Sequence, residues 1–159
     1  MRDQYGVEQV AIQCEILLEV VKEKVELLEQ IFNLTLNQHT VLEMDSYQES
    51  IFENLAKEKD KRIQRINELD DFFERTYTQI KENIMRESSD LKEIIQFIQQ
   101  EIRKIGEWTI QIQLYEEKNR QSLQSNFANI TKTLRNTSIG KTQALRSYKE
   151  HTRFTKKNI

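Results

Sequence analysis

The sequence predicts an all-α protein, an elongated antiparallel bundle of three long helices followed by a short C-terminal helix. Three observations carry this prediction: the 159 residues contain no proline, they contain only three glycines, and apolar residues recur at three- and four-residue spacing over long stretches. Proline breaks helix interiors and glycine weakens them by roughly 1 kcal/mol, so a chain that avoids both favours long helices. A helix of about 40 residues is roughly 60 Å long, and such rods joined by short connections must fold back on one another.

The first helix is expected at about residues 4–43, where one apolar stripe follows the helical period. Thr35 and His39 fill the two stripe positions between Phe32 and Leu42, so His39 is expected to be a hydrogen-bonded residue of the core or its boundary. A metal site would need more ligands than this chain, with two histidines and one cysteine, places at suitable spacing. The stripe comprises Val10, Cys14, Leu17, Val21, Val25, Leu28, Phe32 and Leu42.

The second helix is expected to start near residue 47 and to fade near Arg86. Ser46 and Glu49 have the spacing of a capping box, in which the serine accepts from a backbone amide and the glutamate reaches back. Lys59 interrupts the apolar stripe, and we expect its stem to lie along apolar surface with its amine in water. The stripe comprises Phe52, Leu55, Ile63, Ile66, Leu69, Phe73, Tyr77, Ile80 and Ile84.

The third helix is expected to follow an N-cap at Ser88–Asp90, with a second capping-box pattern from Asp90 to Glu93. Gly106 lies inside it and either permits a close helix approach or is merely tolerated. A break at 136–140 divides the chain into a bundle, residues 1–135, and a basic C-terminal segment, residues 136–159, with a short helix at about 141–151 and a disordered tail. The stripe comprises Leu91, Ile95, Ile98, Ile102, Ile105, Thr109, Ile112, Leu123, Phe127, Ile130 and Leu134.

Charge is distributed unevenly along the chain. Residues 1–131 carry 16 Lys/Arg and 25 Asp/Glu, whereas residues 132–159 carry eight Lys/Arg and one Asp/Glu. A basic end on an acidic body is typical of a segment that docks on a partner, although a solvated terminus explains it equally well. The acidic body disfavours nucleic acid as that partner.

The start of the chain lacks the apolar region of a secretory signal, and no run approaches the ~20 apolar residues of a membrane span. Cys14 is the only cysteine, so no internal disulfide can form. Together these features predict a cytoplasmic protein that is not inserted into a membrane.

The sequence lacks the motifs of the common helical enzymes, so we expect a protein that is not an enzyme and that holds neither a cofactor nor a metal. Di-iron bundles need Glu-x-x-His pairs, and the residues three places before His39 and His151 are Leu36 and Tyr148. The Gly140-Lys141-Thr142 triplet lacks the earlier glycine and the preceding strand of a phosphate-binding loop. Cys14 lies in an apolar stripe, where a buried, inert thiol is expected.

An elongated bundle without site chemistry typically works by offering a helical surface to a partner. The apolar positions that three rods are least able to cover lie late in the third helix and in the fourth. The alternative is that these residues pack against the protein's own bundle, at the start of the first helix. The candidate partner-binding residues are Leu123, Phe127, Ile130, Leu134, Ile139, Leu145 and Tyr148.

Several stretches of the chain resemble the flagellar export chaperones of the FlgN/FliT type. The first is the run from Leu27 to Gln38, continued by Leu42 and Asp45, and the second is the run Ile51–Lys59, which contains Leu55-x-x-x-Lys59. The third is Ile63-x-x-Ile66-x-x-Leu69-Asp70, and the segment Gly140–Tyr148 resembles the family's basic last helix with a tyrosine. The tail from His151 to Ile159 has no counterpart in this pattern.

The resemblance implies a small cytosolic helical protein that holds the terminal helices of hook-associated or filament-cap subunits before export. It implies that the C-terminal region, Leu123 to Tyr148, binds the client subunit and the export gate, with Tyr148 as the residue of gate contact. The alternative function is a structural, self-assembling coiled-coil protein whose interface uses the first two helices. A detached helical sensor or adaptor domain is a third, weaker hypothesis, and both monomer and homodimer remain open.

Overall fold

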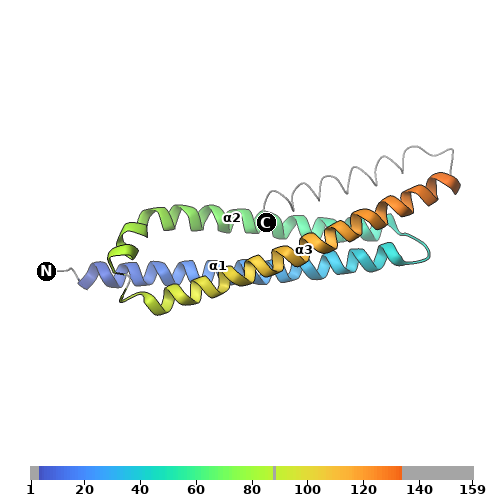
Figure 1. Cartoon of the computed structure of the whole chain (residues 1–159). Coiled ribbons are helices and arrows are strands. Elements are labelled where there is room, and N and C mark those ends of the chain that lie inside the picture. The colour runs from blue at the N-terminus through green and yellow to red at the C-terminus, as the bar shows by residue number, and fades with distance from the viewer. Residues whose placement is uncertain (1–3, 88, 134–159) are drawn as a thin grey trace.

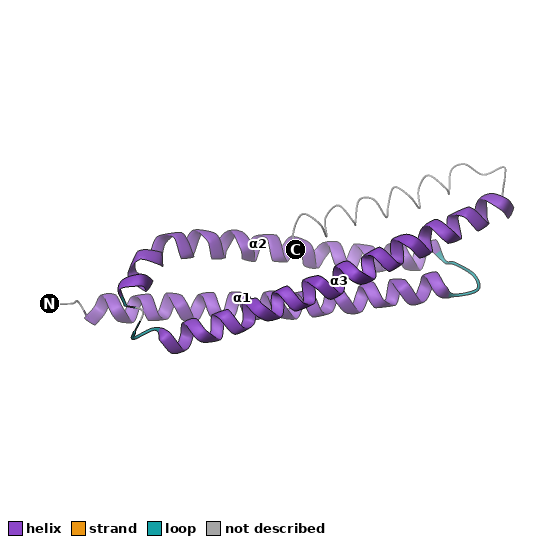
Figure 2. Cartoon of the chain, viewed as in Figure 1, coloured by secondary structure: helices purple, strands orange, loops and turns teal. Residues whose placement is uncertain are grey.

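The computed structural model describes residues 4–87 and 89–133 of the chain, which form three long α-helices. Helix α1 spans Gln4–Glu43, α2 spans Glu49–Arg86 and α3 spans Lys92–Thr133. In Figure 1 the three helices lie lengthwise and run alternately in opposite directions, giving an elongated rod. Figure 2 shows helices joined by short connections, and the described residues contain no strand. The predicted bundle of three long helices is therefore confirmed, whereas the predicted fourth helix and the division at residue 135 lie outside the described residues.

Helix α1 is the central element, because it packs against both α2 and α3. In Figure 1, α3 crosses in front of α1 obliquely, whereas α2 runs nearly alongside α1. Within the described residues, no Cα atom of α2 lies within 8 Å of a Cα atom of α3. Contact between the two outer helices therefore depends on long side chains.

The core consists of three apolar clusters that follow one another along the rod. The first joins Val10, Cys14 and Leu17 of α1 to Ile80 and Leu91. The second joins Leu28 and Ile31 to Ile63, Ile66 and Ile112, and the third joins Val41 and Leu42 to Phe52 and Leu123. In the first two clusters the α1 residues are three or four positions apart, so the helical period aligns their side chains, whereas Val41 and Leu42 of the third cluster are adjacent. Burial raises the pKa of the Cys14 thiol, as expected for an inert cysteine.

The helix bounds agree closely with the predicted ones, but the predicted start of α2 is wrong in detail. The N-cap residue of α2 is Gln48, which has extended backbone angles and makes no side-chain capping hydrogen bond. The helix therefore begins at Glu49, and the capping box of Ser46 with Glu49 does not form. Packing of Phe52 and Tyr47 near the connection, rather than a polar cap, accompanies the start of this helix.

Two positions of the predicted stripes are exposed rather than buried. Tyr77 of α2 and Ile102 of α3 both lie on the surface, although each has the spacing of a core residue. Gly106 is also open to solvent, and an added Cβ there would meet no atom within 4 Å. Of the two explanations for Gly106, the structure therefore supports a tolerated glycine and not a close helix approach.

Glu49, the first residue of α2, is held in an unfavourable environment. Its Oε1 atom is buried, and no hydrogen-bond partner reaches it from the residues that the structure describes. Burial, and then the neighbouring charge of Glu53, raise the pKa of the Glu49 carboxyl above its ordinary value. The helix N-terminus favours a negative charge at this position, so the raised pKa indicates that the cost of burial is the larger effect.

Replacing Glu49 by glutamine is expected to stabilise the protein at neutral pH. A carboxyl whose pKa is higher in the folded state stabilises that state at low pH, and this stability is lost as the pH rises through the folded-state pKa. The glutamine variant should therefore have the higher melting temperature at pH 7, and its advantage should disappear as the pH falls toward 4.5, the ordinary glutamate value. Thermal melts followed by circular dichroism at both pH values test this, and a variant that is less stable at pH 7 would contradict it.

Candidate functional site

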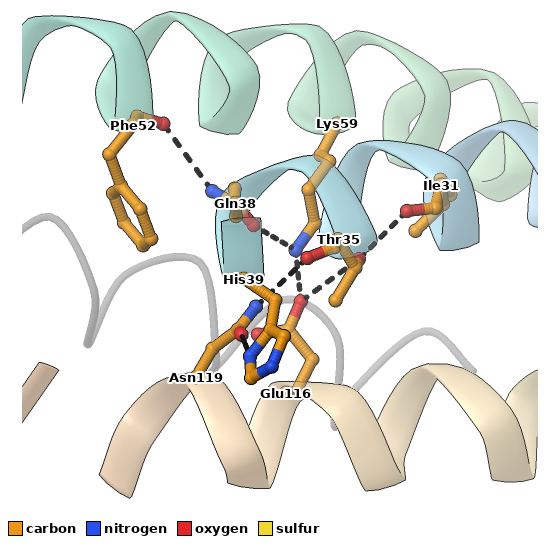
Figure 3. A network of polar contacts seen from close by, with 8 residues as sticks. All are labelled: Ile31, Thr35, Gln38, His39, Phe52, Lys59, Glu116 and Asn119. Atoms are coloured by element: carbon orange, nitrogen blue, oxygen red, sulfur yellow. Dashed lines mark hydrogen bonds and ion pairs between the residues drawn. The ribbon is translucent and has the colours of Figure 1, made fainter. Parts of the chain in front are cut away.

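A layer of buried polar side chains lies between the second and third apolar clusters of the rod. Helix α1 contributes Thr35 and Gln38, α2 contributes Lys59, and α3 contributes Glu116 and Asn119, all of them buried. On α1 the layer falls between Ile31 and Val41, so it interrupts the apolar stripe without leaving the core face. Figure 3 shows these side chains converging from all three helices.

An ion pair between Lys59 and Glu116 forms the centre of this polar layer and joins the two outer helices. The Lys59 Nζ atom donates to Glu116 Oε1, and also to Gln38 Oε1 at 2.9 Å (Figure 3). Because the backbones of α2 and α3 remain apart, a long amine and a long carboxylate are needed to span the gap. The prediction that the amine of Lys59 reaches water is therefore wrong, since only 1 % of this residue is exposed.

The remaining polar groups of the layer are paired with one another and with the backbone. Gln38 Nε2 donates to the carbonyl of Phe52 at 3.4 Å, and Asn119 Nδ2 donates to the carbonyl of Thr35 at 3.0 Å. The Thr35 hydroxyl donates to the carbonyl of Ile31 at 2.7 Å and lies 3.5 Å from Glu116 Oε1. Together with the Lys59–Glu116 ion pair, these bonds connect each helix to the other two. Buried polar groups are tolerated in a core only when paired in this way.

His39 lies at the edge of the layer, as predicted for a hydrogen-bonded boundary histidine. Its Nδ1 atom is 3.0 Å from Asn119 Oδ1, and its Nε2 atom is 3.0 Å from Glu43 Oε1. Its ring packs edge-on against Tyr115, which in turn packs against Phe32. Both ring nitrogens are thus engaged with neighbouring side chains.

The geometry of the polar layer suits positioning better than chemistry. Its amine, carboxylate and amides are hydrogen-bonded within the bundle, and each residue of the layer is at most 6 % exposed. Among the described residues, no group of three or more His, Cys, Asp or Glu is arranged to hold a metal ion. Buried polar residues are known to set the register of packed helices, because a shift of one helix would place them against apolar groups without hydrogen-bond partners.

The predicted partner-binding residues fall partly inside the described structure. Leu123 is buried in the third apolar cluster with Val41, Leu42 and Phe52, so it packs in its own bundle, at the end of α1 rather than at its start. Phe127 is half-buried on the next turn of α3. Ile130 lies within α3, but the placement of its side chain is not described. Leu134, Ile139, Leu145 and Tyr148 lie outside the described residues.

The structure also shows a surface groove that the sequence analysis missed. A groove of about 800 Å³ runs between α1 and α2, and none of its lining residues comes from α3. Its apolar floor consists of Ile12, Ile16, Val20, Leu69 and Phe72, of which Ile12, Ile16 and Phe72 are exposed. Ile12, Ile16 and Val20 repeat at four-residue spacing beside the main stripe of α1, and this second stripe was the signal that could have revealed the groove.

No helix among the described residues is long and apolar enough to cross a lipid bilayer. Comparisons of this chain with protein-family models, with curated proteins and with solved structures found no match.

Proposed function

We propose that this protein is a cytoplasmic flagellar export chaperone that binds the terminal helices of hook-associated or filament-cap subunits, prevents their premature assembly and delivers them to the export gate. The observation that carries the proposal is a long, open helical rod with large apolar side chains on its surface. The described residues expose such side chains on all three helices, for example Ile12 on α1, Phe72 on α2 and Ile110 on α3. Where such side chains gather into a contiguous patch, they typically mark a surface that binds another chain.

The positions of the family-like residues support a shared framework rather than a shared binding surface. Lys59 lies in the buried polar layer and Leu69 is buried. Asp70 forms an ion pair with Lys24 of α1, in which Oδ1 and Nζ are 2.8 Å apart. All three therefore hold α2 to its neighbours. Client contact is left to other residues, and we assign it to the carboxyl end of α3 and the basic segment beyond it.

The mechanism that we propose is physical and involves no reaction. A client end that is unfolded in solution presents an amphipathic helix, and the chaperone covers its apolar face so that clients cannot pair with one another. Release at the gate requires moderate affinity, of about micromolar, which corresponds to roughly −8 kcal/mol. Ordering of the client on binding lowers the net affinity and thereby helps release.

Ending the chain before Gly140 is expected to weaken client binding by at least tenfold without unfolding the bundle, because the removed residues include Leu145 and Tyr148. Calorimetric titration with purified hook-associated and cap subunits of the source organism measures the affinity, and a cooperative melt confirms the fold. The point substitution Tyr148→Ala in the full chain serves as the matched variant for gate contact. Equal affinity of the truncated and full chains would refute the C-terminal assignment, and failure of the full chain to bind any such subunit would refute the proposed function.

A further inference from the structure

The two rims of the groove between α1 and α2 carry charges of opposite sign at the same height along the rod. Helices α1 and α2 are antiparallel, and their register is set by the ion pairs of Glu23 with Arg65 and of Lys24 with Asp70. Moving toward the start of α1 from these pairs therefore means moving toward the end of α2. In this register Glu15 is level with Arg75, Lys22 with Glu68, and Glu26 with Arg65, and all six residues line the groove.

Several of these rim charges are not satisfied within their own chain. In the described part of the structure, neither Glu15 nor Glu26 forms an ion pair, and the Arg75 side chain donates only to the backbone carbonyl of Asp71, at 3.3 Å. Lys22 lies 3.6 Å from Glu19 in a pair that is exposed on both sides, and such pairs contribute little. The apolar floor between the rims is open as well, with 56 % of Ile12 exposed.

We propose that a second copy of this chain occupies the groove, related to the first by a two-fold axis that runs parallel to the helices. Such an axis keeps every residue at its own height and lays α1 of one copy antiparallel over α2 of the other. Glu15 and Arg75 then form an intermolecular ion pair that occurs twice. Lys22 and Glu26 approach Glu68 and Arg65 of the other copy, which already pair with each other at 3.1 Å within their own chain, so these contacts extend an existing ion-pair network. The floor residues Ile12, Ile16 and Phe72 meet their counterparts at the centre of a four-helix arrangement, where water is excluded.

The direction of the axis follows from the same charges. A two-fold axis across the rod would stack α1 on α1 and bring the row of Glu15, Glu19, Glu23 and Glu26 against an identical row. Like charges brought together in this way oppose association. Of the two axes, only the one parallel to the helices brings charges of opposite sign together. This inference does not depend on the chaperone function proposed above.

The first experiment measures the mass of the full chain by sedimentation over a range of concentrations. A dimer is expected, and Ile12→Asp should weaken it at least tenfold because it places a charge on the groove floor. Ile110→Asp is the matched control, since Ile110 is 64 % exposed on α3 and does not line the groove. A monomer at every concentration would mean that the groove is open or covered by another segment or partner, and would overturn the proposal. A dimer that is unaffected by Ile12→Asp would overturn it too.

The second experiment tests the axis through the Glu15 and Arg75 pair. Glu15→Lys and Arg75→Glu should each weaken self-association, because each creates two contacts of like charge in the dimer. An equimolar mixture of the two variants should restore the dimer mass. In the mixed dimer the introduced lysine of one copy faces the introduced glutamate of the other, and the native Arg75 of the first copy faces the native Glu15 of the second. Circular dichroism checks that both variants remain helical. A mixture that associates no better than either variant alone would overturn the proposed geometry.

Discussion

Replacing Lys59 by methionine is expected to lower the free energy of unfolding by about 3–5 kcal/mol. Methionine has nearly the same length and fits the apolar neighbours, so the loss does not come from a cavity. It comes from Glu116, whose carboxylate stays buried after Lys59, with which it forms an ion pair, has been replaced. The Gln38 side chain also loses the donor to its Oε1 atom. Urea unfolding followed by far-UV circular dichroism measures the change.

The double variant Lys59→Met, Glu116→Met separates the burial of an unpaired charge from the loss of the ion pair itself. Replacement of a complete buried ion pair by apolar residues is often neutral or stabilising, because the desolvation cost of both charges disappears. The double variant should therefore recover about half or more of the stability that the single variant loses. If both variants were equally unstable, the buried carboxylate would not be the source of the loss.

The polar layer explains why the rod has one alignment of its helices rather than several. Apolar stripes of leucine and isoleucine pack almost equally well when one helix slides by a turn, because their spacing repeats. Sliding α2 by one turn would place the Lys59 amine against apolar side chains and separate it from Glu116. We therefore expect the double variant to fold but to populate more than one alignment of its helices. The peaks in its proton–nitrogen correlation spectrum should then be broader than those of the native chain.

The fold was predictable from the sequence because helical periodicity and the absence of proline are local properties. The predicted first helix at 4–43 coincides with α1, and the others begin or end within a few residues of α2 and α3. The start of α2 was missed because Ser46 matches a capping pattern that the chain does not use. A capping pattern takes account only of the few residues next to a helix end, whereas the backbone conformation there also depends on the packing around Phe52.

The candidate site was less predictable because it depends on which helices meet and where. Lys59 was recognised as an interruption of a stripe, yet the sequence does not say that Glu116, 57 residues further on, lies opposite. The groove was missed for a related reason. Ile12 and Ile16 were left out of the stripe of the first helix, and only the pairing of α1 with α2 shows that they lie beside Phe72.

Truncating Ile112 to alanine is expected to destabilise the bundle by about 2–5 kcal/mol, because the removed atoms leave a cavity among fully packed neighbours. Ile112 has no exposed surface and belongs to the central cluster with Leu28, Ile31, Ile63 and Ile66. All three helices contribute to that cluster, so the neighbouring side chains cannot relax into the space without shifting a helix.

Ile102→Ala is the matched control for this prediction, since it makes the same substitution in the same helix. Both isoleucines lie on the stripe that the periodicity of the third helix predicts, but Ile102 is 47 % exposed. Alanine also favours the helix by a few tenths of a kcal/mol, which offsets part of the small loss at an exposed site. The two variants should therefore differ by at least about 1.5 kcal/mol in urea unfolding. Equal losses would mean that both positions are buried in solution and that α3 lies differently against α1. The comparison is needed because helical periodicity places both isoleucines on one stripe, and periodicity alone does not show which of them faces a neighbouring helix.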